Sequence, residues 1–424
     1  MVDHIFNNVK EAIDYLEVEN KCVLNNNPDR KKAPIVARSG DINKPITIKE
    51  AEKLIIPTDH IDYPYSAYFN HADTDKFIVT KLYSGRYSLK PNLRSNQYLY
   101  RGQIEYYDPC KPNLFRNPDQ NYFIEECVLY QDLFLLILSH PLVQLLDLGV
   151  ILNGRTFKFE MNVYGISQHY YNKTSCLDLT SKIDVASFFA TNKYDSKNDT
   201  YFPITESSEI GVLYFYNLDL NKDFKKQPNG TQLSTIGLQI FPRSGMQYGF
   251  LLDMGKNDDF NKQHQVSFVK FRHNADISKE INEKFKGGES LFPEDILSTH
   301  WKKYIKGKKR VSENALRLNH LFNQKETLDS LRKKLINEEY IIENYQPCFD
   351  EAELKSYYND IKNGFWEEFC NKIHFPGDQN NKMKDDLLNL PNNDLYKWAF
   401  HPNISHSINY KQGYLLRQWE KYLH

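Results

Sequence analysis

Polar side chains stand at the junction between an expected strand and an expected helix near the middle of the chain. Residues 168–190 read QHYYNKTSCLDLTSKIDVASFFA. This pattern predicts a short strand over 176–180 that runs into a helix, with Thr180 or Ser181 capping the first turn. The free N–H groups at the start of a helix attract anions. The junction therefore suits a phosphate, with Asp178 beside it, although Asp and Thr at such a position are equally common as turn and cap residues.

An arginine followed by a glycine ends another expected strand. The sequence YLYRGQ at 98–103 is followed by LFR at 114–116. An arginine at a sheet edge suits a bidentate grip on phosphate or carboxylate, and a neighbouring glycine leaves room for a ligand to approach closely. Arg101, Gly102 and Gln103 are therefore candidate cofactor-binding residues. The alternative is an arginine that pairs with an acid elsewhere in the fold.

Two later segments add candidates. The sequence FPRSGMQYGFLL at 241–252 places Gln247 just before an apolar strand. A basic run follows further along the chain, and its members are Lys302, Lys303, Lys306, Lys308, Lys309 and Arg310. Such a run can contact the phosphates of a nucleic acid. The alternative, a solvated charged segment between helices, is the more common one in a neutral protein.

The elements that must position these residues indicate an α+β protein. Strand-like segments predict a mixed or antiparallel central sheet with flanking helices, and a helical C-terminal region follows it. The expected helices cover 1–20, 48–54, 123–148 with a break at Pro141, and 410–423, and a capping-box pattern starts another helix at Asp350. We expect three domains, which are an N-terminal extension over 1–94, a central domain over 95–275 and a helical region over 276–424.

Composition narrows the class of protein. The chain has 424 residues and a formal net charge of −1, which predicts no global attraction to nucleic acid or membrane. Its six cysteines form no CxxC pair, so they fit a reducing cytoplasm and argue against a zinc site. The most apolar run, 133–138, is too short to span a bilayer. We expect a soluble cytoplasmic protein without a metal. The motifs of Rossmann dinucleotide sites and of P-loops are also missing from the sequence.

Taken in order, these motifs resemble the FRG domain, a family named for its aromatic-Arg-Gly signature. The resemblance covers about residues 95–275. It rests on YRGQ at 100–103 with LFR at 114–116, on QHY at 168–170 with Thr174, LDLT at 177–180 and AxxFA at 186–190, and on Arg243, Gln247 and Gly249. Tyr171, Lys173 and Cys176 stand where the family usually has Gly, Pro and Leu. The loop after His169 is therefore expected to differ in shape.

The arrangement is also similar to the ADP-ribosyltransferase fold, and this similarity implies a site for NAD or a related nucleotide. Arg101 would hold the diphosphate or a ribose, and Thr180 would support the ribose. His169 would orient a ribose hydroxyl or act as a base. Gln247 would take the place of the usual catalytic Glu. Because an amide cannot bear negative charge opposite an oxocarbenium-like centre, Asp178 would have to supply that charge.

Three classes of function remain open. The first is an enzyme that acts on NAD or another nucleotide, with a protein as target or partner, in bacterial stress or phage defence. It requires Arg101, His169, Asp178, Thr180 and Gln247 to converge on one pocket. The second is a non-catalytic sensor or protein-interaction module, in which the same residues are buried and hydrogen-bonded to one another. The third is a nucleic-acid-binding effector that uses the basic run over 302–310.

Overall fold

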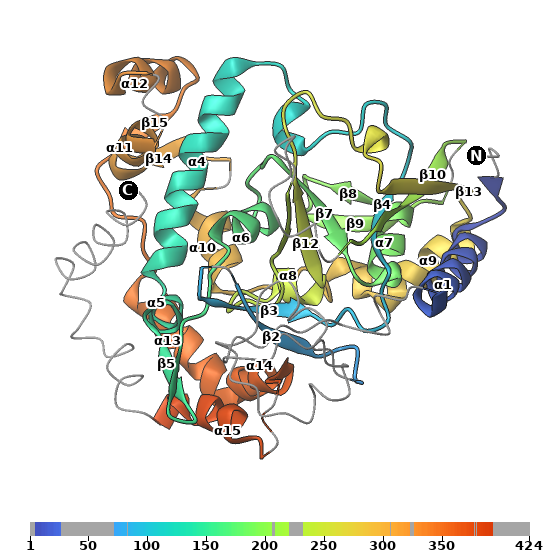
Figure 1. The fold of residues 1–424 in the computed structure, drawn as a ribbon. Helices are drawn as coiled ribbons and strands as arrows, with labels where there is room; N and C mark the ends of the chain where they lie inside the picture. Colours follow the sequence, from blue (N-terminus) through green and yellow to red (C-terminus); the bar gives the residue numbers. More distant parts are fainter. Residues whose placement is uncertain are drawn as a thin grey trace, which may run out of the picture. The chain divides into compact units, whose positions relative to one another are not determined.

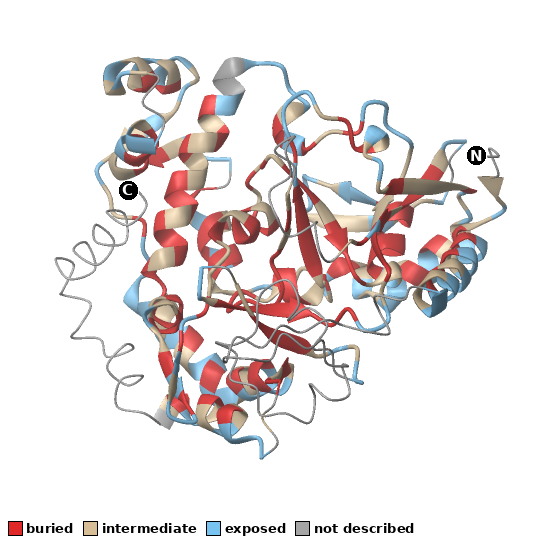
Figure 2. Cartoon of the chain, viewed as in Figure 1, coloured by how far each residue is buried: buried red, intermediate tan, exposed pale blue. Residues whose placement is uncertain are grey.

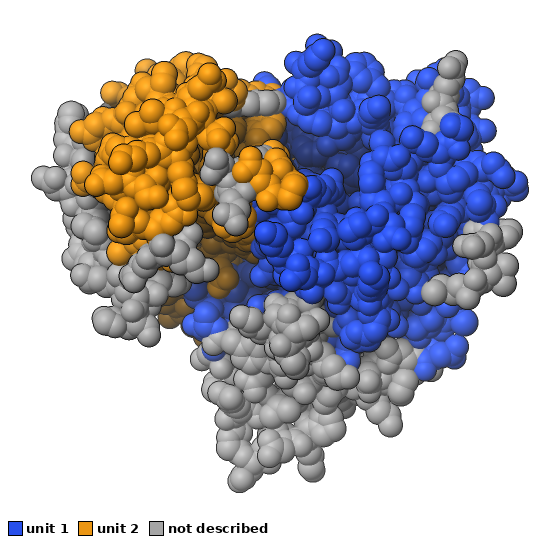
Figure 3. Space-filling view, turned by 90° about the horizontal axis from the view of Figure 1, so that it is seen from above, with its two compact units in different colours: residues 1–116, 175–294, 374–377 blue, residues 117–174, 295–373, 378–424 orange. Residues whose placement is uncertain are grey.

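The structure is a computed structural model, and its chain divides into two compact units, coloured separately in Figure 3. It describes residues 5–26, 72–82, 84–205, 208–219, 232–305, 307–322, 326–376, 378 and 380–392. The helices expected over 48–54 and 410–423 and Lys306 of the basic run lie outside these residues. Unit 1 comprises 1–116, 175–294 and 374–377, and unit 2 comprises 117–174, 295–373 and 378–424. The three-domain division stays a prediction.

Unit 1 is built on a seven-stranded sheet with the strand order β1-β13-β10-β4-β7-β12-β11 (Figure 1). The β1 and β13 strands run parallel, and every other neighbouring pair is antiparallel. The strands of this sheet are β1 (Ile5–Phe6), β4 (Tyr98–Gln103), β7 (Cys176–Thr180), β10 (Ile210–Asn217), β11 (Gln232–Thr235), β12 (Gly249–Asp253) and β13 (Val266–Arg272). Outside it, unit 1 contains the antiparallel pairs β2 (Phe77–Lys81) with β3 (Tyr87–Pro91) and β8 (Asn192–Asp195) with β9 (Thr200–Pro203). The helices of unit 1 are α1 (Val9–Asn26), α7 (Ile183–Thr191), α8 (Arg243–Met246) and α9 (Ala275–Lys284), with the 3₁₀ turns η3 (Asn113–Phe115), η4 (Phe260–Lys262) and η5 (Lys286–Gly288).

The sheet of unit 1 buries side chains on both faces, and the central strands are coloured as buried in Figure 2. Side chains along a strand alternate between the two faces. In β4 this alternation sends Tyr98 and Tyr100 into the core with α1 and α7, while Leu99 joins the core on the opposite face with Leu177 and Leu179 of β7. Polar residues within these strands are therefore held by a rigid frame.

Unit 2 is mainly helical. Its helices are α4 (Gln120–Ser139), α5 (Pro141–Leu148), α6 (Val163–His169), α10 (Ile296–Tyr304), α11 (Glu313–Phe322), α12 (Leu328–Asn337), α13 (Glu351–Asp360), α14 (Trp366–Asn371) and α15 (Lys382–Leu388), with η6 (Ile361–Phe365) and η7 (Leu390–Asn392). Two strand pairs complete it, β5 (Val150–Leu152) with β6 (Arg155–Phe157) and β14 (Arg310–Ser312) with β15 (Ile341–Glu343). A further short strand is β16 (Ile373–His374), of which Ile373 is assigned to unit 2 and His374 to unit 1.

Several predictions about single elements are confirmed. The α+β class with a mixed, mostly antiparallel sheet and a helical C-terminal region is confirmed. The break between α4 and α5 falls at Pro141 as expected, because proline is favoured in the first turn of a helix. The capping box at the start of α13 joins Asp350 to Glu353 in both directions. The N-terminal helix also forms, but its expected bounds are wrong, because Ile5–Phe6 form the strand β1 and the helix begins at Val9 and continues to Asn26.

The described part of the chain contains no single helix that is long and apolar enough to cross a membrane. Among the described helices, α4, counted from Phe123, meets that length and composition only together with α5, and the two helices are bent by 76° at the break between them.

The loop after α6 keeps a backbone conformation that favours glycine, although a tyrosine occupies it. Tyr171 has a φ of 76°, and the left-handed region costs a residue with a side chain roughly 1–2 kcal/mol. We therefore expect Tyr171→Gly to be more stable than Tyr171→Ala by about 1 kcal/mol, since both variants lose the ring but only glycine relieves the strain. Chemical denaturation of the two variants measures this difference. Equal stabilities would contradict the assignment of strain to this residue.

Candidate functional site

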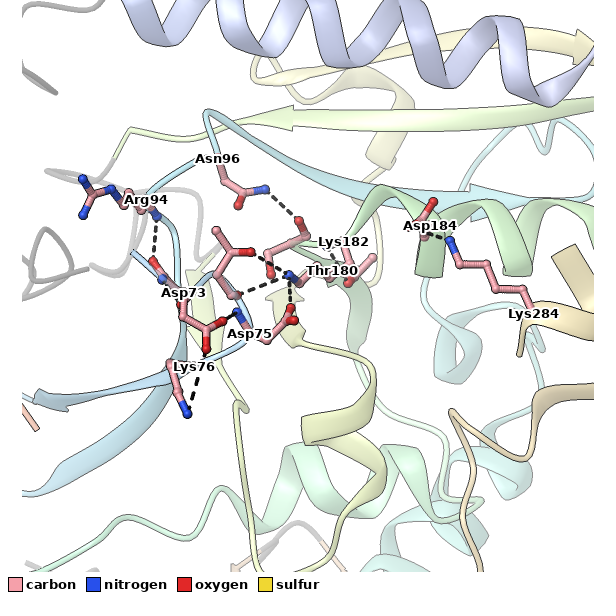
Figure 4. Close-up of polar contacts among 12 residues, drawn as sticks. Asp73, Asp75, Lys76, Arg94, Asn96, Thr180, Lys182, Asp184 and Lys284 are labelled. Atoms are coloured by element: carbon pink, nitrogen blue, oxygen red, sulfur yellow. Dashed lines mark hydrogen bonds and ion pairs between the residues drawn. The ribbon is translucent and has the colours of Figure 1, made fainter. Parts of the chain in front are cut away.

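The junction between β7 and α7 forms where the sequence predicts it, but its capping differs. Lys182 precedes Ile183 at the N-terminus of α7, and no side chain caps this helix. Thr180 instead accepts a hydrogen bond from the Lys182 N–H at 3.1 Å (Figure 4) and donates one to the Gln247 carbonyl at 2.7 Å. The predicted cap by Thr180 or Ser181 is therefore wrong, because the helix starts later and the Thr180 hydroxyl ties β7 to the segment before β12.

Arg101 bridges two strands at the point where their pairing ends. The ladder between β4 and β7 contains one residue pair, Tyr100 with Thr180. Beyond it, Arg101 Nη1 donates to the Asp178 carbonyl at 3.0 Å. Arg101 Nε is buried and has no hydrogen-bond partner among the described residues. The guanidinium therefore bonds to the main chain of β7 with one nitrogen and retains a buried donor.

Gly102 allows the helix α7 to pack closely against the strand β4. A Cβ atom on this residue would lie 1.8 Å from the Ala186 carbonyl oxygen and 2.8 Å from the Ala190 nitrogen. The backbone of α7 thus rests directly on β4, and the space beside Gly102 is filled by the helix. The idea that Gly102 clears a path for a ligand is therefore wrong. This contact gives a physical reason for an Arg-Gly strand and an AxxFA helix to occur together, because both glycine and alanine permit the close approach.

Gln103 and Gln247 are buried, and their side chains form hydrogen bonds within unit 1. The Gln103 amide lies 3.7 Å from Cys110 Sγ, and Gln247 Nε2 donates to the Leu291 carbonyl at 3.1 Å. Gln247 ends α8, since its own N–H bonds back to that helix. Both side chains therefore hold neighbouring segments of unit 1 together.

This geometry predicts the effect of restoring a carboxylate at position 247. In Gln247→Glu the carboxylate would face the Leu291 carbonyl without a proton to donate, which costs about 1–3 kcal/mol. Burial would raise the pKa of the new Glu above its unfolded value of about 4.3. The native state then binds the extra proton, so the loss in unfolding free energy is greatest above the native pKa and disappears as pH falls to about 4. Denaturation at pH 8 and pH 5 tests this, and a variant equally destabilised at both pH values would contradict it.

A second group of side chains in unit 1 includes two aromatic rings that had no local signal in the sequence. The Tyr201 and Phe292 rings stack with centroids 5.2 Å apart and planes at 16°. The Arg243 guanidinium carbon lies 5.9 Å from the Phe292 centroid, and Arg243 Nε donates to the Pro293 carbonyl at 3.3 Å. We call Asp178, Tyr201, Arg243 and Phe292 the Asp178–Arg243 cluster.

The electrostatics link Asp178 and Arg243 through Tyr201. Burial raises the pKa of Tyr201 most, nearby negative groups including Asp178 raise it further, and the positive charge of Arg243 lowers it. Tyr201 therefore remains a neutral phenol at physiological pH. The cluster combines aromatic faces, a guanidinium and a carboxylate, which can stack a planar ring, bind an anion and stabilise positive charge.

His169 belongs to unit 2, where it is the last residue of α6 and is buried. The loop that follows is anchored on Glu126 of α4. The Lys173 N–H donates to Glu126 Oε2 at 3.1 Å, and Asn172 Nδ2 donates to the Glu126 carbonyl at 3.1 Å. Tyr170 hydrogen-bonds to Asp295 in the same unit.

The predicted site residues are thus divided between the units. Unit 1 holds Arg101, Gly102, Gln103, Asp178, Thr180 and Gln247, and unit 2 holds His169. Hydrogen bonds in unit 1 connect Arg101 to Asp178 and Thr180 to Gln247. The sequence offered Arg243 only as part of the Arg-x-x-x-Gln spacing, and nothing in the local pattern selected Tyr201 or Phe292.

The basic run lies in unit 2, and two of its cations contact acids there. Lys309 Nζ is 3.5 Å from a Glu339 carboxylate oxygen, and Arg310 pairs with Glu343. Lys308 donates to the Lys303 carbonyl. Binding of nucleic acid by this run stays a prediction. Within the residues that the structure describes, no three His, Cys, Asp or Glu side chains gather to hold a metal ion.

Residues 96–199 match the model of the FRG domain family. This match supports the resemblance for the motifs between 100 and 190, while Arg243, Gln247 and Gly249 lie beyond the matched residues. No curated protein and no solved structure matches the chain. The comparisons therefore support the FRG domain and lend no support to the similarity with ADP-ribosyltransferases.

Proposed function

We propose that unit 1 binds a nucleotide, NAD or a related molecule, at the Asp178–Arg243 cluster and processes it in the manner of an ADP-ribosyltransferase. The observation that carries the proposal is the combination of a guanidinium, a carboxylate and stacked aromatic rings in one unit. A nucleotide needs these groups, because it presents a planar base, charged phosphates and a sugar carbon that becomes positive when its bond to the base breaks.

In this proposal the roles differ from those implied by resemblance alone. Arg243, with the remaining donors of Arg101, holds the phosphates, and the ring of Phe292 or Tyr201 supports the base. Asp178 supplies the negative charge opposite the oxocarbenium-like centre. Its structural contact with Arg101 uses the main-chain carbonyl, so the carboxylate is not part of that bond.

Thr180 and Gln247 support the frame in this proposal, since each bonds to a main-chain carbonyl. A role for His169 as a base, a cytoplasmic location and a part in phage defence belong to the same proposal. Of the residues proposed from the motifs, Arg101 and Asp178 stay at the nucleotide site of unit 1, and Arg243, Tyr201 and Phe292 are added to them.

The second candidate is a non-catalytic sensor or protein-interaction module. It is favoured by the hydrogen bonds of Arg101, Thr180 and Gln247, each of which reaches a carbonyl inside unit 1. In that case the signature residues would act only as internal ties. The two candidates differ in one measurable property, which is the binding of a nucleotide.

The test is ligand-dependent stabilisation of the full chain by NAD, ADP-ribose and a panel of nucleotides. A ligand at 100 times its Kd stabilises the native state by about 2.7 kcal/mol, so we expect a rise in melting temperature with NAD or ADP-ribose. We expect Arg243→Gln to lose this rise, and Arg272→Gln, an exposed arginine of β13, to keep it. A chain that no nucleotide stabilises, or an Arg243→Gln variant that responds as wild type does, would favour the non-catalytic module.

A further inference from the structure

A lysine at the junction of β7 and α7 is covered by a carboxylate of the same chain. Lys182 Nζ lies 2.7 Å from Asp75 Oδ1 (Figure 4). The same ammonium group donates to the Thr74 carbonyl at 3.2 Å and lies 4.8 Å from the centroid of the Tyr248 ring. The Asp75 side chain is 73% exposed, so its carboxylate meets Lys182 on the solvent side.

A buried hydroxyl without a partner adjoins this lysine. Ser181 is 4% exposed, and among the described residues its Oγ has no hydrogen-bond partner. Its main-chain groups are used, since the N–H donates to the Tyr248 carbonyl at 3.3 Å and the carbonyl accepts from Asn96 Nδ2 at 2.7 Å. Buried polar atoms are nearly always paired. An unpaired hydroxyl directly before the first turn of α7 is therefore a donor that a ligand can use.

Tyr248 places its hydroxyl beside Asp75. Its side chain hydrogen-bonds to Asp75, and burial first, then the charges of Asp75 and Asp73, raise the pKa of Tyr248. The group is therefore a neutral phenol that donates a proton. Asp75 thus occupies an anion position between an ammonium and a phenol.

Two other carboxylates near this place have lysine partners of their own. Asp184 in the first turn of α7 lies 2.8 Å from Lys284, and Asp73 lies 3.9 Å from Lys76 (Figure 4). Moving Asp75 aside therefore removes the carboxylate that pairs with Lys182, at a helix N-terminus where the helix dipole also favours an anion.

We propose that Ser181, Lys182 and Tyr248 form a binding site for a phosphate group, which Asp75 masks by acting as a competing internal anion. A phosphate offers more charge and more acceptor oxygens than a carboxylate, so it can replace Asp75 and reach several donors at once. The site is argued from this junction alone and does not depend on the nucleotide proposed at the Asp178–Arg243 cluster.

The test is calorimetric titration of inorganic phosphate into the full chain at constant ionic strength, with glycerol phosphate in parallel to separate free phosphate from a phosphorylated molecule. We expect Asp75→Asn to bind one of these probes about tenfold more tightly than wild type. We expect Asp75→Asn combined with Lys182→Gln to lose this binding. Asp184→Asn is the matched control. Asp184 lies in the first turn of α7 and is also the exposed partner of a lysine, but that lysine is Lys284 of α9 and not Lys182.

Two results would overturn the proposal. One is equal affinity of wild type and Asp75→Asn for both probes. The other is binding that persists when Lys182 is replaced. Thermal melts without ligand confirm that each variant is folded, and since Asp75 is exposed its substitution is expected to leave the fold intact.

Discussion

Replacing Gly102 with alanine is expected to destabilise unit 1 by about 3 kcal/mol or more. The added Cβ would lie 1.8 Å from the Ala186 carbonyl oxygen, well inside the distance that two non-bonded atoms can reach. Overpacking a core commonly costs 1–3 kcal/mol. Here the obstacle is the main chain of α7, so relief requires the whole helix to move away from β4. Denaturant or thermal unfolding of Gly102→Ala against wild type measures the loss.

Two further variants test whether the clash with α7 causes the loss of stability in Gly102→Ala. Gly255→Ala is the control, since the nearest atom to its new Cβ is an Asp258 carboxylate oxygen at 3.2 Å, which can shift. We expect that variant to lose less than about 1 kcal/mol. Adding Ala186→Gly to Gly102→Ala should restore nothing, because the clash involves backbone atoms. A stable Gly102→Ala protein, or rescue by Ala186→Gly, would contradict the account of this contact.

Asp178→Asn is expected to reduce nucleotide turnover by about 100-fold or more while leaving stability nearly unchanged. Removing a group that stabilises charge in the transition state typically costs 10²–10³-fold in rate. The variant keeps the main-chain carbonyl that accepts the Arg101 hydrogen bond and has almost the same volume. Activity and stability should therefore separate. Release of the base from NAD, followed by chromatography, measures the activity.

Asp184→Asn is the appropriate control for this loss. Asp184 lies on α7, and its exposed ion pair with Lys284 contributes little to stability. It should retain full turnover. If Asp178→Asn turns over NAD as fast as Asp184→Asn does, the carboxylate has no catalytic role. If Asp178→Asn also melts far below wild type, the side chain belongs to the frame of unit 1.

The elements around the site could be read from the sequence because their signals are local. Alternation and apolar spacing located β7 and α7, and the proline in the first turn of α5 and the acids at the start of α13 indicated two helix starts. The packing role of Gly102 could not be predicted from local sequence patterns. Its neighbour Ala186 is 84 residues further along the chain, and only the packed structure shows which backbone fills the space.

The same limit applies to the candidate site. Arg101 and Asp178 were selected by type and spacing, and they do lie together, but the atom that joins them is a main-chain carbonyl. Tyr201 and Phe292 come from a hairpin and from the segment after η5, and stacking between them depends on how α9 and β9 fold back. A hydrophobic pattern cannot distinguish such half-buried rings from ordinary core residues.

The division into units also has a physical reason that the sequence conceals. The segment over 117–174 leaves the sheet after β4 and packs with helices from the C-terminal part, and the chain then returns to form β7. Long-range packing of this kind carries no local signal. The sequence motif that joins His169 to Asp178 therefore crosses from unit 2 to unit 1.

The most direct test of the proposed function is a crystal structure of the full chain soaked with ADP-ribose or with the nucleotide that stabilises it most. We predict electron density for the ligand in unit 1, with a phosphate on Arg243 and a ring against Phe292 or Tyr201. Ligand density located only elsewhere, or none in crystals grown under conditions that saturate the protein in solution, would contradict a nucleotide site at the Asp178–Arg243 cluster.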